Sequence, residues 1–169
     1  MKPVIIKNIE IGKGLPKIAV PLVAANTQEL DQALRVLKET AFDIIEFRAD
    51  FFQAALNADF IAEQLGIVRQ AFPDKPLLFT FRRAKEGGNT PCADDYYFEL
   101  LEKIICSKQA DIIDIELFAE ESGVKQTIAL AHEYQTAALL CGARFLGQLV
   151  PRLSQRCAQR GTLVSRIQG

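Results

Sequence analysis

Five short apolar runs alternate with amphipathic segments along most of this 169-residue chain, and the alternation restricts the folds that it can adopt. The runs are almost continuously apolar, which predicts strands that are covered on both faces, as in parallel sheets. Their starts lie about 25–35 residues apart, which leaves room for a crossover helix after each strand. The predicted strands are residues 17–24, 42–47, 76–81, 111–118 and 136–141.

The segments between these strands carry the helical period. Asn26 or Thr27 is a suitable N-cap for the first predicted helix, and Asp94 is one for the third. Residues 4–16 are predicted to form a small hairpin ahead of the first strand. The predicted helices are residues 27–40, 58–72, 94–108 and 120–134.

Both a doubly wound open sheet and a (β/α)8 barrel fit this order of elements. No GxGxxG or GxxxxGK[ST] motif follows the first strand, so a nucleotide-binding open sheet has no support. Charged residues instead follow three successive strands, where barrel enzymes build their sites. These residues are Glu46, Arg48, Arg82, Arg83, Glu86, Asp114 and Glu116. We therefore predict an α/β chain with five β/α units and an N-terminal hairpin, and the charges favour a (β/α)8 TIM barrel over an open sheet.

The stretch "FDIIEFRADFF" ends the second predicted strand with alternating charges. Successive side chains of a strand point to opposite faces, so Glu46 and Arg48 share one face and Phe47 lies on the other. If Phe47 meets the helices, the two charged side chains point into the barrel mouth. Charges in that position are costly unless they are paired or used by a ligand. The stretch therefore indicates either a structural ion pair or a site for a polyhydroxylated or anionic ligand.

The stretch "LLFTFRRAKEGG" brings a second charged cluster to the end of the next strand. Arg82 can donate hydrogen bonds to hydroxyl groups or to a carboxylate. Glu86 follows four residues later, where its carboxylate can orient a histidine that acts as an acid or base. A solvated loop that carries Lys85 and Glu86 is the alternative interpretation.

Composition excludes several classes of partner. The net charge of −1 gives no general attraction to nucleic acid. No stretch reaches the roughly 18 uncharged apolar residues of a membrane span, and Lys7 and Glu10 interrupt the N-terminal segment where a signal peptide would be apolar. The four cysteines contain no CxxC motif, which argues against a zinc site or a disulfide framework. We expect a cytoplasmic protein without metal, nucleic-acid or membrane partners.

Three segments, "DIIEFRAD", "KPLLFTFRRAKEGG" and "DIIDIELF", occur in this order, and with them the chain resembles type I 3-dehydroquinate dehydratase over roughly residues 1–135. The hairpin and the "VKQTIALAHEY" helix also fit. The resemblance implies a (β/α)8 barrel, usually a homodimer, that dehydrates 3-dehydroquinate to 3-dehydroshikimate in the shikimate pathway. It implies neither a metal nor an external cofactor.

The resemblance also implies roles for individual residues. In the family a lysine forms a Schiff base with the substrate ketone, and a histidine removes the neighbouring proton and helps the hydroxyl group to leave. Glu86 matches the carboxylate that positions this histidine. Asp114 and Glu116 match as well and are expected near the site, without an assigned catalytic step. The positions that match substrate-contacting residues are Glu46, Arg48 and Arg82.

The chain departs from the family pattern at the two groups that perform the chemistry. Ala143 and Arg144 stand where the family has the histidine and the aspartate that follows it. His132 is the one histidine of the chain, and its place in a predicted helix does not favour a role as the base. No lysine follows Lys125, so the Schiff-base lysine has no counterpart. We expect the chain to be catalytically defective.

Residues 143–169 differ in character from residues 1–142, which we predict to be a partial barrel domain. This tail has five arginines but no lysine and no acidic residue. A reading-frame shift near codons 136–143 would explain the new composition, the end of the resemblance and the missing half of the barrel together. A shortened paralogue, or an arm that binds nucleic acid or membrane, is an alternative.

Five strands cannot close an eight-stranded barrel, because closure links strand number, tilt and shear. The first and fifth strands are therefore expected to be open edges, and we expect poor solubility or association. Pro21 removes one ladder donor from the first strand. Three functions remain: a dehydratase by descent, a non-catalytic half-barrel that binds or associates, and, with less support, another Schiff-base barrel enzyme such as a class I aldolase.

Overall fold

A six-stranded parallel sheet forms the centre of the computed structural model, which describes residues 3–142 and 163–164. The strands lie in chain order, so each pairs with the next along the sequence. Ahead of them, β1 (Val4–Ile6) and β2 (Ile9–Ile11) form an antiparallel hairpin, as predicted. The strands of the sheet are β3 (Ala19–Leu22), β4 (Ile44–Arg48), β5 (Leu77–Thr80), β6 (Ile112–Glu116), β7 (Ala137–Cys141) and β8 (Leu163–Val164).

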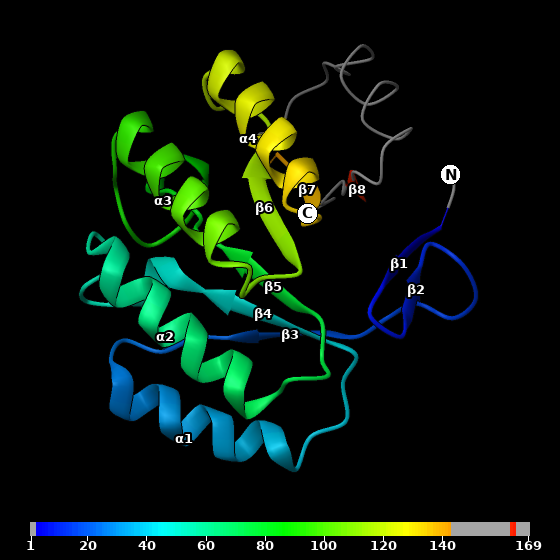
Figure 1. Cartoon of the computed structure of the whole chain (residues 1–169). Coiled ribbons are helices and arrows are strands. Elements are labelled where there is room, and N and C mark those ends of the chain that lie inside the picture. Colours follow the sequence, from blue (N-terminus) through cyan, green and yellow to red (C-terminus); the bar gives the residue numbers. More distant parts are fainter. Residues whose placement is uncertain (1–2, 143–162, 165–169) are drawn as a thin grey trace.

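Helices follow β3, β4, β5 and β6 in turn, which confirms the predicted alternation. Figure 1 shows these helices side by side along one face of the sheet, with β1 and β2 lying apart from them. Short 3-10 turns, η1 (Ala49–Phe51) and η2 (Ala84–Glu86), follow β4 and β5. The helices are α1 (Thr27–Lys38), α2 (Ala58–Ala71), α3 (Asp94–Ser107) and α4 (Glu121–Glu133).

The helix caps confirm one prediction and correct another. The Asn26 side chain accepts a hydrogen bond of 3.0 Å from the backbone N–H of Glu29, so Asn26 caps α1 as predicted. The prediction that Asp94 caps α3 is wrong, because Ala93 is the N-cap residue and makes no side-chain cap bond. The Asp94 carboxylate instead accepts hydrogen bonds from Arg83 and Lys85, and two cations attract it more strongly than a backbone N–H does.

Replacing Asn26 with alanine is expected to lower the free energy of unfolding by about 1 kcal/mol, because the first turn of α1 loses its side-chain acceptor. Urea denaturation of the purified variant measures this loss. Thr27→Ala, at the neighbouring position, is the matched control and is expected to change stability by less than about 0.5 kcal/mol. Equal losses in the two variants would contradict the assignment of the cap.

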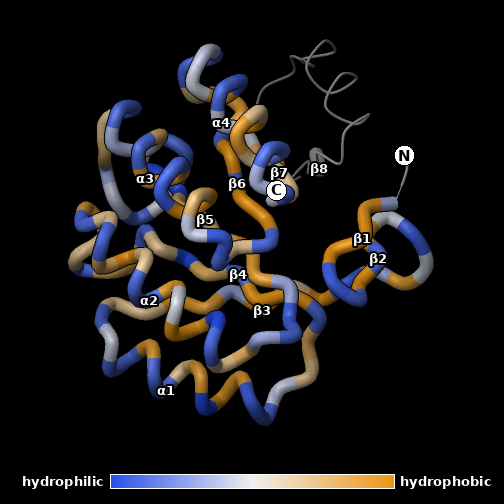
Figure 2. The backbone as a smooth tube through the Cα atoms, viewed as in Figure 1, coloured by the Kyte–Doolittle hydropathy of each residue, from blue (hydrophilic) through white to orange (hydrophobic). Residues whose placement is uncertain are grey.

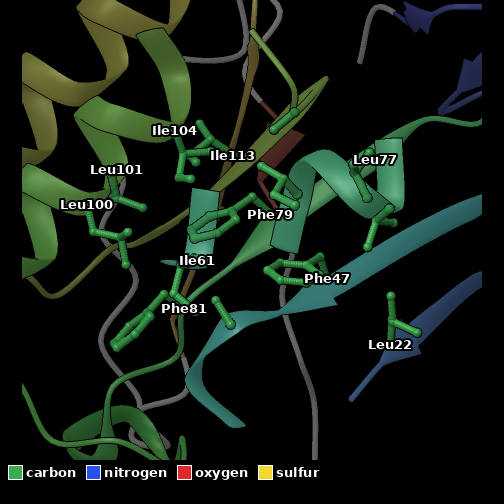
Figure 3. Close-up of a cluster of buried hydrophobic side chains, with 14 of the residues drawn as sticks. Leu22, Phe47, Ile61, Leu77, Phe79, Phe81, Leu100, Leu101, Ile104 and Ile113 are labelled. Atoms are coloured by element: carbon green, nitrogen blue, oxygen red, sulfur yellow. The ribbon is translucent and has the colours of Figure 1, made fainter. Parts of the chain in front are cut away.

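The main core lies between the sheet and the helices. Figure 3 shows side chains of β4, β5 and β6 meeting those of α2 and α3, and Phe47, Phe79 and Ile113 are all 0% exposed. The Phe47 and Phe79 rings stack with their centroids 6.1 Å apart. Burying a large apolar side chain stabilises the fold by about 1.5–3 kcal/mol, so this layer holds the helices on the sheet. Figure 2 shows the matching pattern, with apolar strands and helices that carry polar residues along part of their length.

A smaller apolar cluster covers the opposite, inner face of the sheet near the N-terminal ends of its strands. Ile44, Leu78 and Ile112 are buried there against Ile6 of the hairpin. Since alternate residues of a strand share a face, Glu46, Thr80 and Asp114 follow on the same face nearer the C-terminal ends. The inner face is therefore apolar under the hairpin and polar at its other end.

The two predicted edge strands differ. β3 ends the described sheet and carries Pro21 on its exposed edge, where a missing N–H is tolerated. The prediction of an open edge at β7 is wrong, because β8 pairs with it in parallel through Leu139↔Leu163 and Leu140↔Val164. Two residues of the predicted tail thus satisfy backbone groups of β7. Ala143 and the five tail arginines lie outside the described residues, and low solubility stays a prediction.

Candidate active site

The C-terminal ends of the strands bring several charged side chains of the inner face together. On β4, Phe47 is fully buried toward the helices while Glu46 and Arg48 are half-buried on the other face, as predicted. Arg48 is paired in register with Thr80 of β5, and Glu116 of β6 with Cys141 of β7. We call the group below the strand-end cluster. It consists of Glu46, Arg48, Thr80, Arg82, Asp114 and Cys141.

Arg48 is held by an acid that the sequence interpretation did not select. Its Nε and Nη2 donate to the two carboxylate oxygens of Asp50, both at 3.0 Å, and its guanidinium lies 4.8 Å from the ring centre of Phe51. Asp50 is 0% exposed. The ion-pair interpretation therefore applies to Arg48 and Asp50, whereas Glu46 has no ion-pair partner among residues 3–142.

Arg82 crosses to the next strand and pairs with Asp114. Its Nη2 donates to Asp114 Oδ2 at 2.7 Å, and the Cys141 thiol hydrogen-bonds with both residues. Within the described part of the chain, three buried polar atoms here have no hydrogen-bond partner: Arg82 Nη1, Asp114 Oδ1 and Thr80 Oγ1. Buried polar groups are nearly always satisfied, so these atoms are available for hydrogen bonds with water or with a ligand.

The electrostatics of the pair follow from its burial. Burial raises the pKa of Asp114 to about 6, since Arg82 and the Cys141 thiol only partly offset the loss of water. The nearby Glu46 carboxylate adds to this rise. Burial lowers the pKa of Arg82, but attraction from Asp114 and Cys141 outweighs it, and the net pKa is raised. Arg82 is therefore always charged, while Asp114 can change its charge in mildly acidic solution.

The raised pKa of Asp114 predicts a pH dependence of stability. The folded chain keeps the Asp114 proton up to about pH 6, whereas an unfolded chain releases it near pH 4. The folded state binds more protons in this window, so Asp114 favours folding at low pH and this contribution is lost as the pH rises from about 4 to about 6. Asp114→Asn is expected to remove that fall in urea denaturation measured across the window. Asp59→Asn, at an exposed position, is expected to keep it.

Arg83 turns away from the cluster into the protein interior. Its backbone N–H and its Nε donate to the two Glu116 oxygens at 2.8 and 2.6 Å, and its guanidinium lies 4.2 Å from the ring centre of Tyr97. The Tyr97 hydroxyl accepts the backbone N–H of Glu116 at 2.9 Å. Adjacent arginines thus have different tasks: Arg82 faces the inner side, and Arg83 joins the ends of β5 and β6 beneath α3.

Glu86 is buried at the end of η2, in the tight loop after β5. Gly87 closes this turn with a φ of 84°, and an added Cβ at Gly88 would lie 1.7 Å from the Arg82 carbonyl oxygen. Only glycine fits such a close approach, so the loop folds tightly against the end of β5. The predicted role of Glu86 in orienting a histidine remains a prediction.

The single histidine lies far along the strands from the cluster. His132 belongs to α4 and lines a hollow with Asp111 and Ala137, which stand at the N-terminal ends of β6 and β7. Among residues 3–142 and 163–164, no group of three or more histidine, cysteine or acidic side chains is arranged to hold a metal ion. No helix in the same residues is long and apolar enough to cross a bilayer.

Comparison with known proteins gives one consistent family. The family model of type I 3-dehydroquinase matches residues 18–162. The chain is 52% identical over 140 residues to 3-dehydroquinate dehydratase of Neisseria gonorrhoeae strain NCCP11945, which is 83% of this chain and 55% of the relative. It is 40% identical over 145 residues to the Clostridium novyi protein of the same name, 86% of this chain and 57% of that one. The chain thus spans about half the length of these relatives.

Solved structures show the same arrangement of strands and helices. One is a type I 3-dehydroquinate dehydratase of Clostridium difficile, solved with covalently modified comenic acid, which matches this chain with a TM-score of 0.79 and 37% sequence identity. The match covers 82% of this chain and 55% of the Clostridium difficile chain. The 3-dehydroquinate dehydratase of Enterococcus faecalis matches with a TM-score of 0.84 and 31% sequence identity, and the match covers 95% of this chain and 68% of that one. The predicted fold class, the first β/α units of a TIM barrel, is confirmed.

Proposed function

The chain belongs to the type I 3-dehydroquinase family, and from this premise we propose that its strand-end cluster binds 3-dehydroquinate. The observation that carries the proposal is the set of buried atoms without partners at Arg82, Asp114 and Thr80. These atoms lie on the inner face beside two arginines that ion pairs hold in place. A small polyhydroxylated acid supplies the donors and acceptors that such atoms lack.

The arginines of the cluster are proposed to donate hydrogen bonds to the substrate, and Glu46 to accept them. Arg48 and Arg82 present N–H donors to substrate oxygens, and pairing with Asp50 and Asp114 fixes their guanidinium planes before the substrate arrives. Glu46, which has no ion-pair partner in the described residues, accepts hydrogen bonds from substrate hydroxyl groups. Opposite charges on one small surface suit a ligand that carries hydroxyl groups and a carboxylate.

The reaction of the family removes a proton beside a ketone and expels a neighbouring hydroxyl group as water. A lysine amine that condenses with the ketone supplies the electron sink, and a histidine moves the proton. His132 stands at the other end of the strands. By the resemblance, Ala143, which lies outside the described residues, corresponds in sequence to the base of the family. We therefore propose that this chain binds the substrate without turning it over, and that Glu86 would orient a base placed there.

The remaining expectations from the family are also proposals. The lyase reaction needs no metal and no external cofactor, and a homodimer is the expected assembly. The cytoplasm is the proposed location, and the wide spacing of the four cysteines in the sequence, without a CxxC motif, supports it.

A second candidate function is association through β3, the strand at the edge of the described sheet. Ile18 and Val23, which flank the edge strand β3, are 58% and 43% exposed, and Ile5 of the hairpin is 73% exposed. Exposed apolar side chains beside an unpaired edge favour contact with another chain. Size-exclusion chromatography with light scattering tests this function, since a monomer at all concentrations would contradict it.

Isothermal titration of the full chain with 3-dehydroquinate tests the proposed binding, and an assay for 3-dehydroshikimate tests turnover. We expect saturable binding without product. Cyclohexanecarboxylate, which has the acid but neither ketone nor hydroxyl groups, is the control ligand and is expected to bind far more weakly. Absence of 3-dehydroquinate binding would overturn the proposal. Formation of 3-dehydroshikimate would overturn the part of it that says the chain does not turn the substrate over.

A further inference from the structure

Asp50 collects hydrogen bonds from three separate parts of the candidate site. Besides its two bonds from Arg48, its carboxylate accepts the backbone N–H groups of Arg82 at 3.3 Å and of Asn89 at 3.1 Å. Its carbonyl oxygen accepts the hydroxyl group of Thr90 at 2.6 Å. The residue lies in η1, directly after β4, and is 0% exposed. One buried carboxylate therefore joins the end of β4 to the end of β5 and to the loop beyond it.

The loop after β5 depends on this connection for its path. The Ala84 N–H donates to the Thr90 carbonyl at 3.1 Å, and Arg83 and Thr90 form an isolated parallel bridge. The loop thus leaves β5, passes Glu86 and returns to Asp50 at Asn89 and Thr90. Because two backbone N–H groups point at Asp50, its negative charge is stabilised from the loop as well as from Arg48.

The geometry points to Asp50 as the positioning residue of the substrate site, an inference that rests on the proposed binding of 3-dehydroquinate. Asp50 is fully buried and does not touch a ligand itself. It fixes the guanidinium plane of Arg48 through two parallel bonds and fixes the backbone of Arg82 through a third. Arg48 and Arg82 therefore reach the same ligand from adjacent strands with their donors already aligned.

Asp50→Asn tests this inference because the amide has the same shape but places an NH2 group opposite donors. Its dissociation constant for 3-dehydroquinate is expected to rise about ten- to hundredfold, the effect of losing a charged hydrogen-bond acceptor. Asp31→Asn removes the acid of an exposed Asp–Arg pair and is the matched control, with unchanged affinity expected.

A double-mutant cycle separates positioning from general loosening of the fold. If Asp50 acts through Arg48, Asp50→Asn weakens binding clearly less in an Arg48→Ala background than in the wild-type chain. Equal losses in both backgrounds would overturn the inference, as would a folded Asp50→Asn chain with wild-type affinity. If Asp50→Asn does not fold, Thr90→Val removes one loop contact alone, and it must weaken binding for the inference to stand.

Amide hydrogen exchange measures the contacts of Asp50 with the backbone of Arg82 and Asn89 in the absence of a ligand. The amides of Arg82 and Asn89 are expected to exchange faster in Asp50→Asn, while amides of α1 keep their rates. A wild-type chain that does not bind 3-dehydroquinate would overturn the proposed function. Unchanged exchange at Arg82 and Asn89 would overturn the positioning role, so the two failures are distinguishable.

Discussion

Arg83→Ala is expected to lower the free energy of unfolding by about 3–5 kcal/mol, the cost of removing one partner from a buried ion pair. The substitution leaves the fully buried Glu116 carboxylate without its cation and takes away the guanidinium beside the Tyr97 ring. Urea denaturation followed by circular dichroism measures the loss. The ends of β5 and β6 would keep the short sheet ladder, the Arg82–Asp114 pair and the backbone bond from residue 83 to Glu116.

Lys85→Ala is the matched control for this prediction. Lys85 pairs with the same acid as Arg83, Asp94, but it is half exposed, so its loss is expected to cost less than about 1 kcal/mol. Similar losses of unfolding free energy in Arg83→Ala and Lys85→Ala would contradict the claim that the buried Arg83–Glu116 pair stabilises the fold.

Arg82→Ala is expected to weaken 3-dehydroquinate binding by about two orders of magnitude, since the loss of hydrogen bonds from a charged donor to the ligand costs about 1.5–3 kcal/mol. The variant loses the Nη1 donor that has no protein partner, and it leaves Asp114 as an uncompensated buried acid. Isothermal titration measures the dissociation constant.

Two further variants set the limits of this prediction. Arg82→Lys keeps the charge but cannot form the same planar set of donors, so intermediate affinity is expected. Arg35→Ala removes an exposed arginine of α1 and is expected to leave affinity unchanged. Wild-type affinity in Arg82→Ala would place the ligand elsewhere.

Sequence patterns predicted those parts of the structure that depend on neighbouring residues. The alternation around Phe47 placed Glu46 and Arg48 on one face because a strand repeats every two residues. Asn26 was one of two candidate caps for α1, because the oxygen of a cap residue needs only an N–H within the next three residues. The charges after three strands predicted the candidate site, because parallel strands end at one edge of the sheet.

The partners of these charges could not be predicted, because they come from distant parts of the chain. Arg82 meets Asp114 across 32 positions, and Asp50 reaches Asn89 across 39. The sequence predicted Asp94 as a helix cap, but its carboxylate accepts hydrogen bonds from Arg83 and Lys85, which lie in the loop after β5. The pairing of β8 with β7 was missed because two residues carry no periodic signal.

We propose above all that 3-dehydroquinate binds at the C-terminal ends of β4, β5 and β6. Titration of the isotope-labelled chain with this ligand, followed by nuclear magnetic resonance, tests it most directly. We expect saturable shifts in the Nε–H signals of Arg48 and Arg82 and in the backbone signal of Asn89, with the signals of Arg69 and His132 unchanged. Shifts confined to Arg69 and His132, near the opposite ends of the strands, or no saturable shift at all, would contradict it.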